Sequence, residues 1–194
     1  MKHILPENPA LILIDIQKGF DEIDYWGGQR NNPQAEDNAR LLLQHWRKNK
    51  LPFFHVNHNS KSPASPLHQS NPGNQVKDAL KPLPGEAIIK KNVHSAFIGT
   101  NLKELLDAQN ITTVVVVGLT TDHCVSTTSR MASDYGYETF VVSDATATFR
   151  KKGINGTDDS FDAELVHQVT LASLQKDFAT ILSTGELLDS FNTN

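Results

Sequence analysis

Cys124 is the single cysteine in 194 residues, and its place in the sequence suits a nucleophile. The apolar run 111–117 precedes it, and a segment that can be helical follows from about residue 123. A thiol between a strand end and a helix N-terminus lies near unpaired backbone N–H groups and the positive end of the helix dipole, which favour the thiolate. Free cysteines are also among the most buried side chains, so position alone leaves a structural cysteine equally open.

Two charged residues follow other apolar runs in the same way. Asp15 closes the run 10–14, and Lys91 follows the short run 87–89. A buried carboxylate needs a partner, although Asp is also common at helix caps and Lys is usually solvated. Beside a thiol, a carboxylate and an ammonium can set the ionisation of the nucleophile. Lys90 competes with Lys91 for this place, and alternation along a strand puts the two on opposite faces.

The rest of the chain alternates short apolar runs with helical repeats. Strands are predicted at residues 10–14, 52–56, 87–89, 111–117, 139–142 and 178–182. Helices are predicted at 34–49, 100–109, from about 123, over 159–175 with Phe161, Leu165, Val169 and Ala172 in register, and after Thr184. Two longer loops, 59–76 and 144–158, interrupt the pattern and are expected to cover a site or make a contact.

Strands separated by helices predict βαβ units. We therefore expect a single α/β domain over residues 1–194, a three-layer α/β/α Rossmann-like fold with a six-stranded, mainly parallel sheet. Such a sheet places its site at the carboxyl ends of the strands, where the strand order reverses. Asp15, Lys91 and Cys124 each follow a predicted strand, which favours their meeting at that edge.

Together these segments resemble the isochorismatase-like cysteine hydrolases, the superfamily of nicotinamidases, N-carbamoylsarcosine amidohydrolase and isochorismatase. The signature of that superfamily reads D-x-Q-x-x-F, then K-x-x-x-S-A-F, then G-x-x-T-x-x-C. Its blocks match residues 15–20, 91–97 and 118–124, in that order and after the expected strands. Each block alone is weak, whereas the ordered set is specific and the resemblance runs over residues 9–183.

The resemblance implies a catalytic triad of Asp15, Lys91 and Cys124. Cys124 would attack a carbonyl carbon, Asp15 would carry the proton, and Lys91 would orient Asp15. The superfamily also has a cis peptide that maps to Leu119-Thr120, and it implies an oxyanion hole made by the backbone N–H groups of Thr120 and Cys124. Because isochorismatase itself cleaves a vinyl ether without a thiol nucleophile, Cys124 favours hydrolysis of an amide or ureide C–N bond.

Nicotinamidases of this superfamily carry a metal site after the second strand, with an Asp-x-His pair. Here Asn57 and Asn59 stand at the best-matching positions, so we expect no metal and no other cofactor. A ligand set of His55, His58 and His68 is the alternative, but residues three apart on a strand point to opposite faces. Nicotinamide becomes a weaker candidate substrate, since that metal holds its pyridine nitrogen.

The remaining candidates concern the substrate pocket. Residues in and near the signature segments are expected to line it. Phe20 and Phe97 could equally belong to the core, and His94 and His123 favour a structural or solvent-facing place over a catalytic one. These candidates are Gln17, Phe20, Trp26, His94, Phe97 and Leu119, with His123 as a weaker one. The sequence leaves the identity of the small-molecule substrate open.

Composition and charge exclude several classes of protein. The net charge of −4 and the scattered basic residues argue against nucleic acid as the main partner. No signal peptide or membrane-spanning run is expected, and one cysteine favours a reducing compartment, so we predict a cytoplasmic protein. The resemblance also implies a homodimer or homotetramer, with the loop 59–76 as the candidate contact.

Two other classes of protein share some of these sequence features. A protein of the same fold could use a lone reactive thiol for binding or redox sensing, but such a protein needs neither Asp15 nor Lys91. A dinucleotide-binding protein would need G-x-G-x-x-G after the first strand, where residues 15–19 read D-I-Q-K-G. An amide hydrolase is therefore the leading hypothesis.

Overall fold

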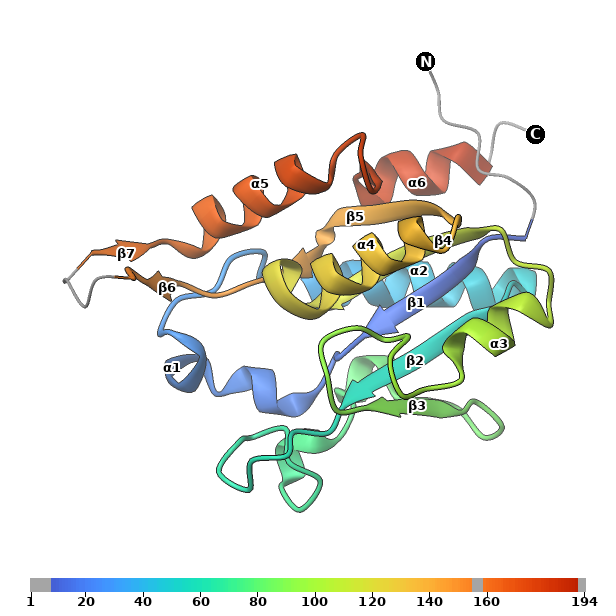
Figure 1. Cartoon of the computed structure of the whole chain (residues 1–194). Coiled ribbons are helices and arrows are strands. Elements are labelled where there is room, and N and C mark those ends of the chain that lie inside the picture. Colours follow the sequence, from blue (N-terminus) through green and yellow to red (C-terminus); the bar gives the residue numbers. More distant parts are fainter. Residues whose placement is uncertain (1–7, 155–158, 192–194) are drawn as a thin grey trace.

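The computed structural model describes residues 8–154 and 159–191, and its centre is a six-stranded sheet in which every strand pair is parallel (Figure 1). This confirms the predicted α/β fold. The strand order is β3-β2-β1-β4-β5-β8. The strands are β1 (Ala10–Ile14), β2 (Phe53–His58), β3 (Ile88–Lys91), β4 (Thr113–Leu119), β5 (Glu138–Ala147) and β8 (Thr180–Leu182).

Helices cover both faces of this sheet (Figure 1). The α-helices are α1 (Ile23–Trp26), α2 (Ala35–Asn49), α3 (Leu102–Asp107), α4 (Ser126–Asp134), α5 (Ala163–Leu174) and α6 (Thr184–Phe191). Short helical turns are η1 (Lys18–Asp21), η2 (Pro72–Asn74) and η3 (Asp78–Leu80), and η4 (Thr121–Val125) is π-helical. A small antiparallel hairpin pairs β6 (Lys151–Lys152) with β7 (Ser160–Phe161). The sequence pattern had indicated neither α1 nor this hairpin.

Alternate residues of each strand divide the interior into two cores, as expected for a sheet buried on both faces. In β1, Leu11 and Leu13 face the core under α2 and α6. Ala10, Ile12 and Ile14 face the core under α3, α4 and α5. Every residue of β1 and β4 is buried, which explains the continuous apolar runs at residues 10–14 and 114–117.

Helix α5 differs from the prediction in the face that it buries. Leu165 and Val169, which the pattern placed in register with Phe161, are 48% and 60% exposed. Phe161 itself lies in β7, because the helix begins at Ala163 and not at residue 159 as predicted. The buried side instead carries Ala163, His167, Leu171 and Leu174. His167 is accommodated there because its Nδ1 lies 2.9 Å from the Thr121 hydroxyl. Apolar spacing therefore marked a real stripe on this helix, but not the one that contacts the sheet.

The strand order reverses beside β1, and this positions the site. From β1 the chain adds β2 and β3 on one side, and then returns to place β4 on the other. The crevice at the carboxyl ends of β1 and β4 is thus the switch point at which such sheets bind ligands. In Figure 1 the arrowheads of β1 and β2 point toward the region of α1 and of the loop that follows β2.

Gly118 allows β1 and β4 to approach closely at this end of the sheet. Its φ is +118°, and a Cβ there would lie 1.9 Å from the carbonyl oxygen of Ile14. Only glycine fits such a contact without moving a backbone. The residue after Ile14 is Asp15, so this contact fixes the spacing between the two strand ends that carry Asp15 and Cys124.

Among the helices of the described residues, none has the length and apolarity required to cross a membrane.

Candidate active site

Asp15, Lys91 and Cys124 meet beyond the carboxyl ends of their strands. The ammonium of Lys91 lies 2.6 Å from Asp15 Oδ2 and 3.2 Å from Cys124 Sγ. The side chains of Lys91 and Asp15 have no exposed area, and Cys124 is 7% exposed. A carboxylate oxygen of Asp15 lies within 4.8 Å of Sγ. The structure therefore brings together the three residues that the signature indicated.

Each of these side chains is placed by a strand end. Asp15 follows β1 with a φ of +50°, and its N–H donates to the carbonyl of Val56 on the neighbouring strand at 2.7 Å. Asp is one of the few residues that tolerate this left-handed conformation. Lys91 is the last residue of β3, and Cys124 lies in η4 immediately after β4. The neighbouring Lys90 is exposed, so alternation distinguished the two lysines correctly.

The protonation of this cluster differs from the thiolate that a helix N-terminus would favour. Burial raises the pKa of the Cys124 thiol far above its ordinary value, and the Asp15 carboxylate raises it further, while Lys91 acts in the opposite direction. Burial disfavours charge on Lys91, but Asp15 and Cys124 outweigh it and raise the pKa of that ammonium. These directions favour a charged ammonium on Lys91 and a neutral thiol on Cys124 in the resting site.

Asp15 can still accept a proton in this arrangement. Its Oδ2 accepts from Lys91, whereas its buried Oδ1 has no hydrogen-bond partner among the described residues. A buried oxygen without a partner is costly, and such exceptions are concentrated at functional sites. Oδ1 is therefore free to accept a proton.

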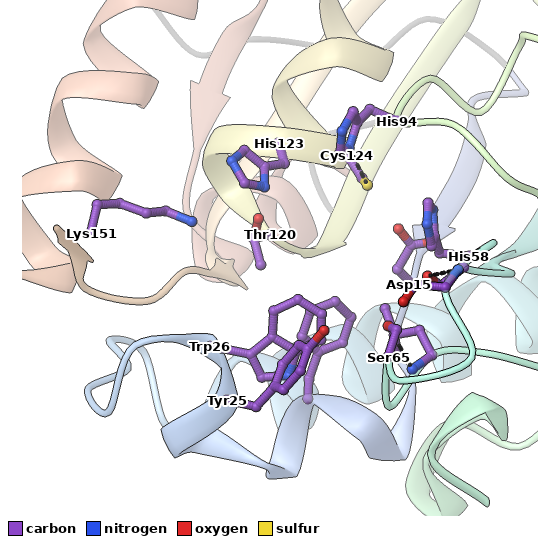
Figure 2. Close-up of a pocket in the computed structure, with 14 residues that line it drawn as sticks. Asp15, Tyr25, Trp26, His58, Ser65, His94, Thr120, His123, Cys124 and Lys151 are labelled. Atoms are coloured by element: carbon purple, nitrogen blue, oxygen red, sulfur yellow. Dashed lines mark hydrogen bonds between the residues drawn. The ribbon is translucent and has the colours of Figure 1, made fainter. Parts of the chain in front are cut away.

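Cys124 opens into a cavity of about 200 Å³, whose lining residues are drawn in Figure 2. Thr120 and Cys124 both line it, and the peptide bond between Leu119 and Thr120 is cis, as the resemblance implies. The hydroxyl of Thr120 is buried and has no partner among the residues that the structure describes. A buried hydroxyl without a partner is an exception that is concentrated at functional sites.

Three of the six predicted pocket residues line this cavity, and three lie behind its wall. Phe20, Trp26 and His94 are in the lining. Gln17 is fully buried, and its amide bonds the backbone of His58 in both directions. Phe97 packs in the core against Tyr135 and Tyr137, and Leu119 is 1% exposed in the core under α2. These three side chains do not line the cavity, because Gln17 is held by hydrogen bonds to a strand end and Phe97 and Leu119 pack in the core.

One wall of the cavity is aromatic (Figure 2). The rings of Phe20 and Trp26 are 4.7 Å apart, and Tyr25 meets Trp26 edge-on at 4.8 Å. The indole N–H of Trp26 donates to the carbonyl of Gly19 at 2.8 Å. Since its only donor is occupied, Trp26 offers the cavity an apolar ring rather than a hydrogen bond.

The charged groups around the cavity are already paired. Asp15 is paired with Lys91, and Lys151 lies 3.0 Å from the carboxylate of Asp122. Asp122 also accepts from the hydroxyl of Thr148 and lies 3.3 Å from His123. Burial lowers the pKa of His123 despite that carboxylate. The lysines and carboxylates at this site thus neutralise one another.

The donor set near the thiol does not fit a metal. Asp15, His58 and Cys124 offer ligand atoms within 4.8 Å of one another. The ammonium of Lys91, however, lies within 3.2 Å of all three residues and already supplies the positive charge among them. A dication there would have to displace a fully buried cation. His55 is instead 3.4 Å from Glu86, and His68 is 2.7 Å from Ser70, so the alternative histidine set does not converge.

Several lining residues had no motif to reveal them. They are Tyr25 and Leu67, the serines Ser60, Ser62 and Ser65, His58 at the end of β2, and Lys151 of β6. The loop 59–76 supplies the serines and Leu67, as its length and composition suggested. The position of His58 at a strand end next to the switch point was the one available signal for that residue.

The fold and site together define a parallel α/β protein with a carboxylate, an ammonium and a thiol gathered at the switch point. A family model described as "Isochorismatase domain" matches residues 9–186, and the chain belongs to this family of hydrolases. It is similar to the uncharacterized isochorismatase family protein YrdC of Bacillus subtilis (strain 168), with 45% identity over 96% of this chain and 98% of that protein.

Two further similarities extend this result. A crystal structure from Chromobacterium violaceum, described as an isochorismatase-family hydrolase, aligns with a TM-score of 0.93, 36% identity and full coverage of both chains. Nicotinamidase 3 of Arabidopsis thaliana is 27% identical over 95% of this chain and 89% of that protein.

Proposed function

We propose that this chain hydrolyses a C–N bond of a small amide or ureide through a thioester on Cys124. The observation that carries the proposal is the buried contact of Lys91 with both Asp15 and Cys124, two residues that line the cavity. A lone reactive thiol needs no such pair, whereas a nucleophile with a high pKa needs an adjacent base. Its family relative nicotinamidase 3, by name, also acts on an amide.

In the first half of the proposed reaction, the thiol proton of Cys124 moves to Oδ1 of Asp15 as the sulfur attacks the carbonyl carbon. The backbone N–H groups of Thr120 and Cys124 stabilise the oxyanion, a role in which one donor typically contributes about 3 kcal/mol. The C–N bond then breaks, and Asp15 returns the proton to the departing nitrogen. Lys91 stays charged and keeps Asp15 oriented through its 2.6 Å contact.

In the second half, water attacks the thioester carbon, and Asp15 accepts a proton from that water. The C–S bond breaks as the carboxylic acid forms, and the proton on Asp15 returns to the sulfur. One water is consumed, one acid and one amine are released, and the site regains its neutral thiol. The free Oδ1 of Asp15 supports this shuttle, because it has no other hydrogen bond to break among the described residues.

The acyl group that this cavity favours is small, uncharged and partly flat. About 200 Å³ holds only a small group, and the aromatic wall of Phe20, Tyr25 and Trp26 suits an apolar face. A substrate carboxylate would be taken out of water with no unpaired lysine among the described lining residues to meet it, which costs several kcal/mol.

A panel of primary amides and N-carbamoyl compounds, uncharged and anionic, tests the proposal through release of ammonia. Cys124→Ala is expected to abolish turnover, and mass spectrometry of quenched wild-type enzyme is expected to show the acyl mass on Cys124. An uncharged substrate should exceed its anionic counterpart in kcat/KM. Undiminished turnover in Cys124→Ala would overturn the thioester mechanism.

The alternative is a binding or redox-sensing protein of the same fold. It predicts no turnover on any amide, together with rapid oxidation or alkylation of Cys124 at neutral pH. The high pKa of the buried thiol favours the enzyme, because the thiolate is the form that oxidants attack.

A further inference from the structure

The ammonium of Lys91 has three protons, and the structure offers it three acceptors. Asp15 Oδ2 lies at 2.6 Å, Cys124 Sγ at 3.2 Å, and Nδ1 of His58 at 3.2 Å. An ammonium can only donate, so Nδ1 of His58 accepts. Since Nδ1 is the acceptor, the single proton of the neutral ring lies on Nε2.

We propose that His58 is a positioning residue, whose neutral imidazole accepts the third proton of Lys91 and so holds the ammonium between Asp15 and the thiol. This inference rests on the proposed function, since it assigns His58 a part in the same reaction. His58 acts through Lys91 and requires no contact with the substrate. Without it, a buried N–H of the ammonium would lack an acceptor, and the ammonium would be free to tilt away from the sulfur.

The fold holds His58 firmly in this place. It is the last residue of β2 and lies opposite Lys91 in the parallel register. The Gln17 side chain accepts from the His58 N–H at 2.8 Å and donates to its carbonyl at 3.1 Å. The amide of Asn74 donates to the same carbonyl at 3.1 Å. Gln17, predicted as a pocket residue, thus serves the site by fixing the backbone of His58.

The charges around His58 keep it neutral. Burial lowers the pKa of His58, and the ammonium of Lys91 lowers it further. The ring of His94 stacks at 6.3 Å and acts in the same direction, whereas the Asp15 carboxylate acts in the opposite direction. Cys124, the other titratable group that faces it, is a neutral thiol at rest. Protonation of His58 would remove the acceptor and place two cations 3.2 Å apart.

The neutral state of His58 determines how the site depends on pH. Because the pKa of His58 lies below its ordinary value of about 6.5, the imidazole is neutral at neutral pH. The site is then complete above that pKa and loses its third acceptor as the pH falls through it. We therefore expect kcat/KM to fall at acid pH, and part of this fall to result from protonation of His58.

Two substitutions separate this role from simple packing. His58→Gln keeps an oxygen that can accept from Lys91 but cannot ionise, whereas His58→Leu keeps the bulk and loses the acceptor. With the amide of highest Cys124-dependent turnover, His58→Leu is expected to lose about ten- to a hundredfold in kcat/KM at neutral pH. His58→Gln should retain most of it, with the acid limb moved to lower pH. His45→Gln, which removes a histidine from α2 beside Phe191, is the matched control and should match wild type.

Ring ¹⁵N NMR provides a readout that needs no substrate. The His58 resonances, assigned by their loss in His58→Gln, should show an unprotonated Nδ1 in the wild-type protein. In Lys91→Met the pKa of His58 should rise, since the neighbouring cation is gone. A protonated Nδ1, or equal activity and equal pH profiles in both His58 variants, would overturn the inference. If Cys124→Ala instead keeps its turnover, the proposed function fails, and the NMR result still decides the contact.

Discussion

Replacing Lys91 with Met tests the buried pair that organises the site. Met has a similar length and no charge, so it removes the ammonium and leaves Asp15 in place. Asp15 then loses its Oδ2 partner at 2.6 Å, while its Oδ1 already lacks one among the described residues. Removing one member of a buried ion pair typically destabilises a protein by about 3–5 kcal/mol, because the other charge stays buried without compensation.

For a chain of this size, about 3–5 kcal/mol corresponds to a fall of about 6–20 °C in the midpoint of thermal unfolding. The lone carboxylate avoids its buried charge by binding a proton when the variant folds. The free energy of unfolding of the variant should therefore fall as pH rises, and its deficit relative to wild type should shrink in acid. Turnover should drop about 10²- to 10⁴-fold, since Asp15 is protonated and cannot act as the base.

A double-mutant cycle with Asp15→Asn decides whether the two residues are coupled. Lys91→Met/Asp15→Asn contains no buried charge and should recover most of the stability that Lys91→Met loses, without recovering turnover. Lys103→Met is the matched control, because it removes an exposed ion pair with Asp107 and should leave unfolding nearly unchanged. Additive losses in the cycle, or a Lys91→Met deficit that does not vary with pH, would refute the reasoning.

Three further predictions concern the geometry and the surroundings of this site. Gly118→Ala should destabilise the protein by about 3 kcal/mol in urea unfolding, since its Cβ would meet the Ile14 carbonyl at 1.9 Å. Asp15→Asn should abolish turnover yet speed alkylation of Cys124 by iodoacetamide in mild alkali, because one of the groups that raise the thiol pKa is gone. The homo-oligomer remains a prediction, and if a second copy covers the exposed stripe of α5, Val169→Glu should reduce the mass measured by light scattering.

Each of these predictions has a result that would contradict it. Gly136→Ala also has a positive φ but meets nothing within 4 Å, so an equal loss in both glycine variants would remove the clash with Ile14 as the cause. Slower alkylation in Asp15→Asn would mean that the carboxylate does not hold the thiol neutral. A monomeric mass for the wild-type protein would dismiss the expected oligomer.

The sheet was predictable because its central strands are buried on both faces. The run Ala10–Ile14 was predicted with the same bounds that β1 has, and the carboxyl ends of β1, β3 and β4 brought the three signature residues together. The local sequence pattern did not predict the ends of elements that depend on tertiary contacts. β5 continues through the polar residues Ser143 and Asp144 to Ala147, because its end pairs with β4 after a register shift.

The cavity was less predictable than the triad. Its lining includes α1 and β6, two short elements without a periodic pattern of their own. Sequence spacing also says which residues share a face, but not whether that face meets the cavity or the core. Gln17 and Phe97 illustrate this limit, since both lie in signature segments and both point away from the ligand space.

The distances along the chain between the reacting groups have a consequence for folding. Lys91 is 76 residues from Asp15 and 33 residues from Cys124, and the strands that carry them join only through parallel, long-range pairing. Such contacts form late, because loop closure must precede them. In a chain with its helices formed but β4 not yet beside β1, Cys124 is still apart from Asp15. During refolding, recovery of turnover should therefore trail the recovery of helical circular dichroism.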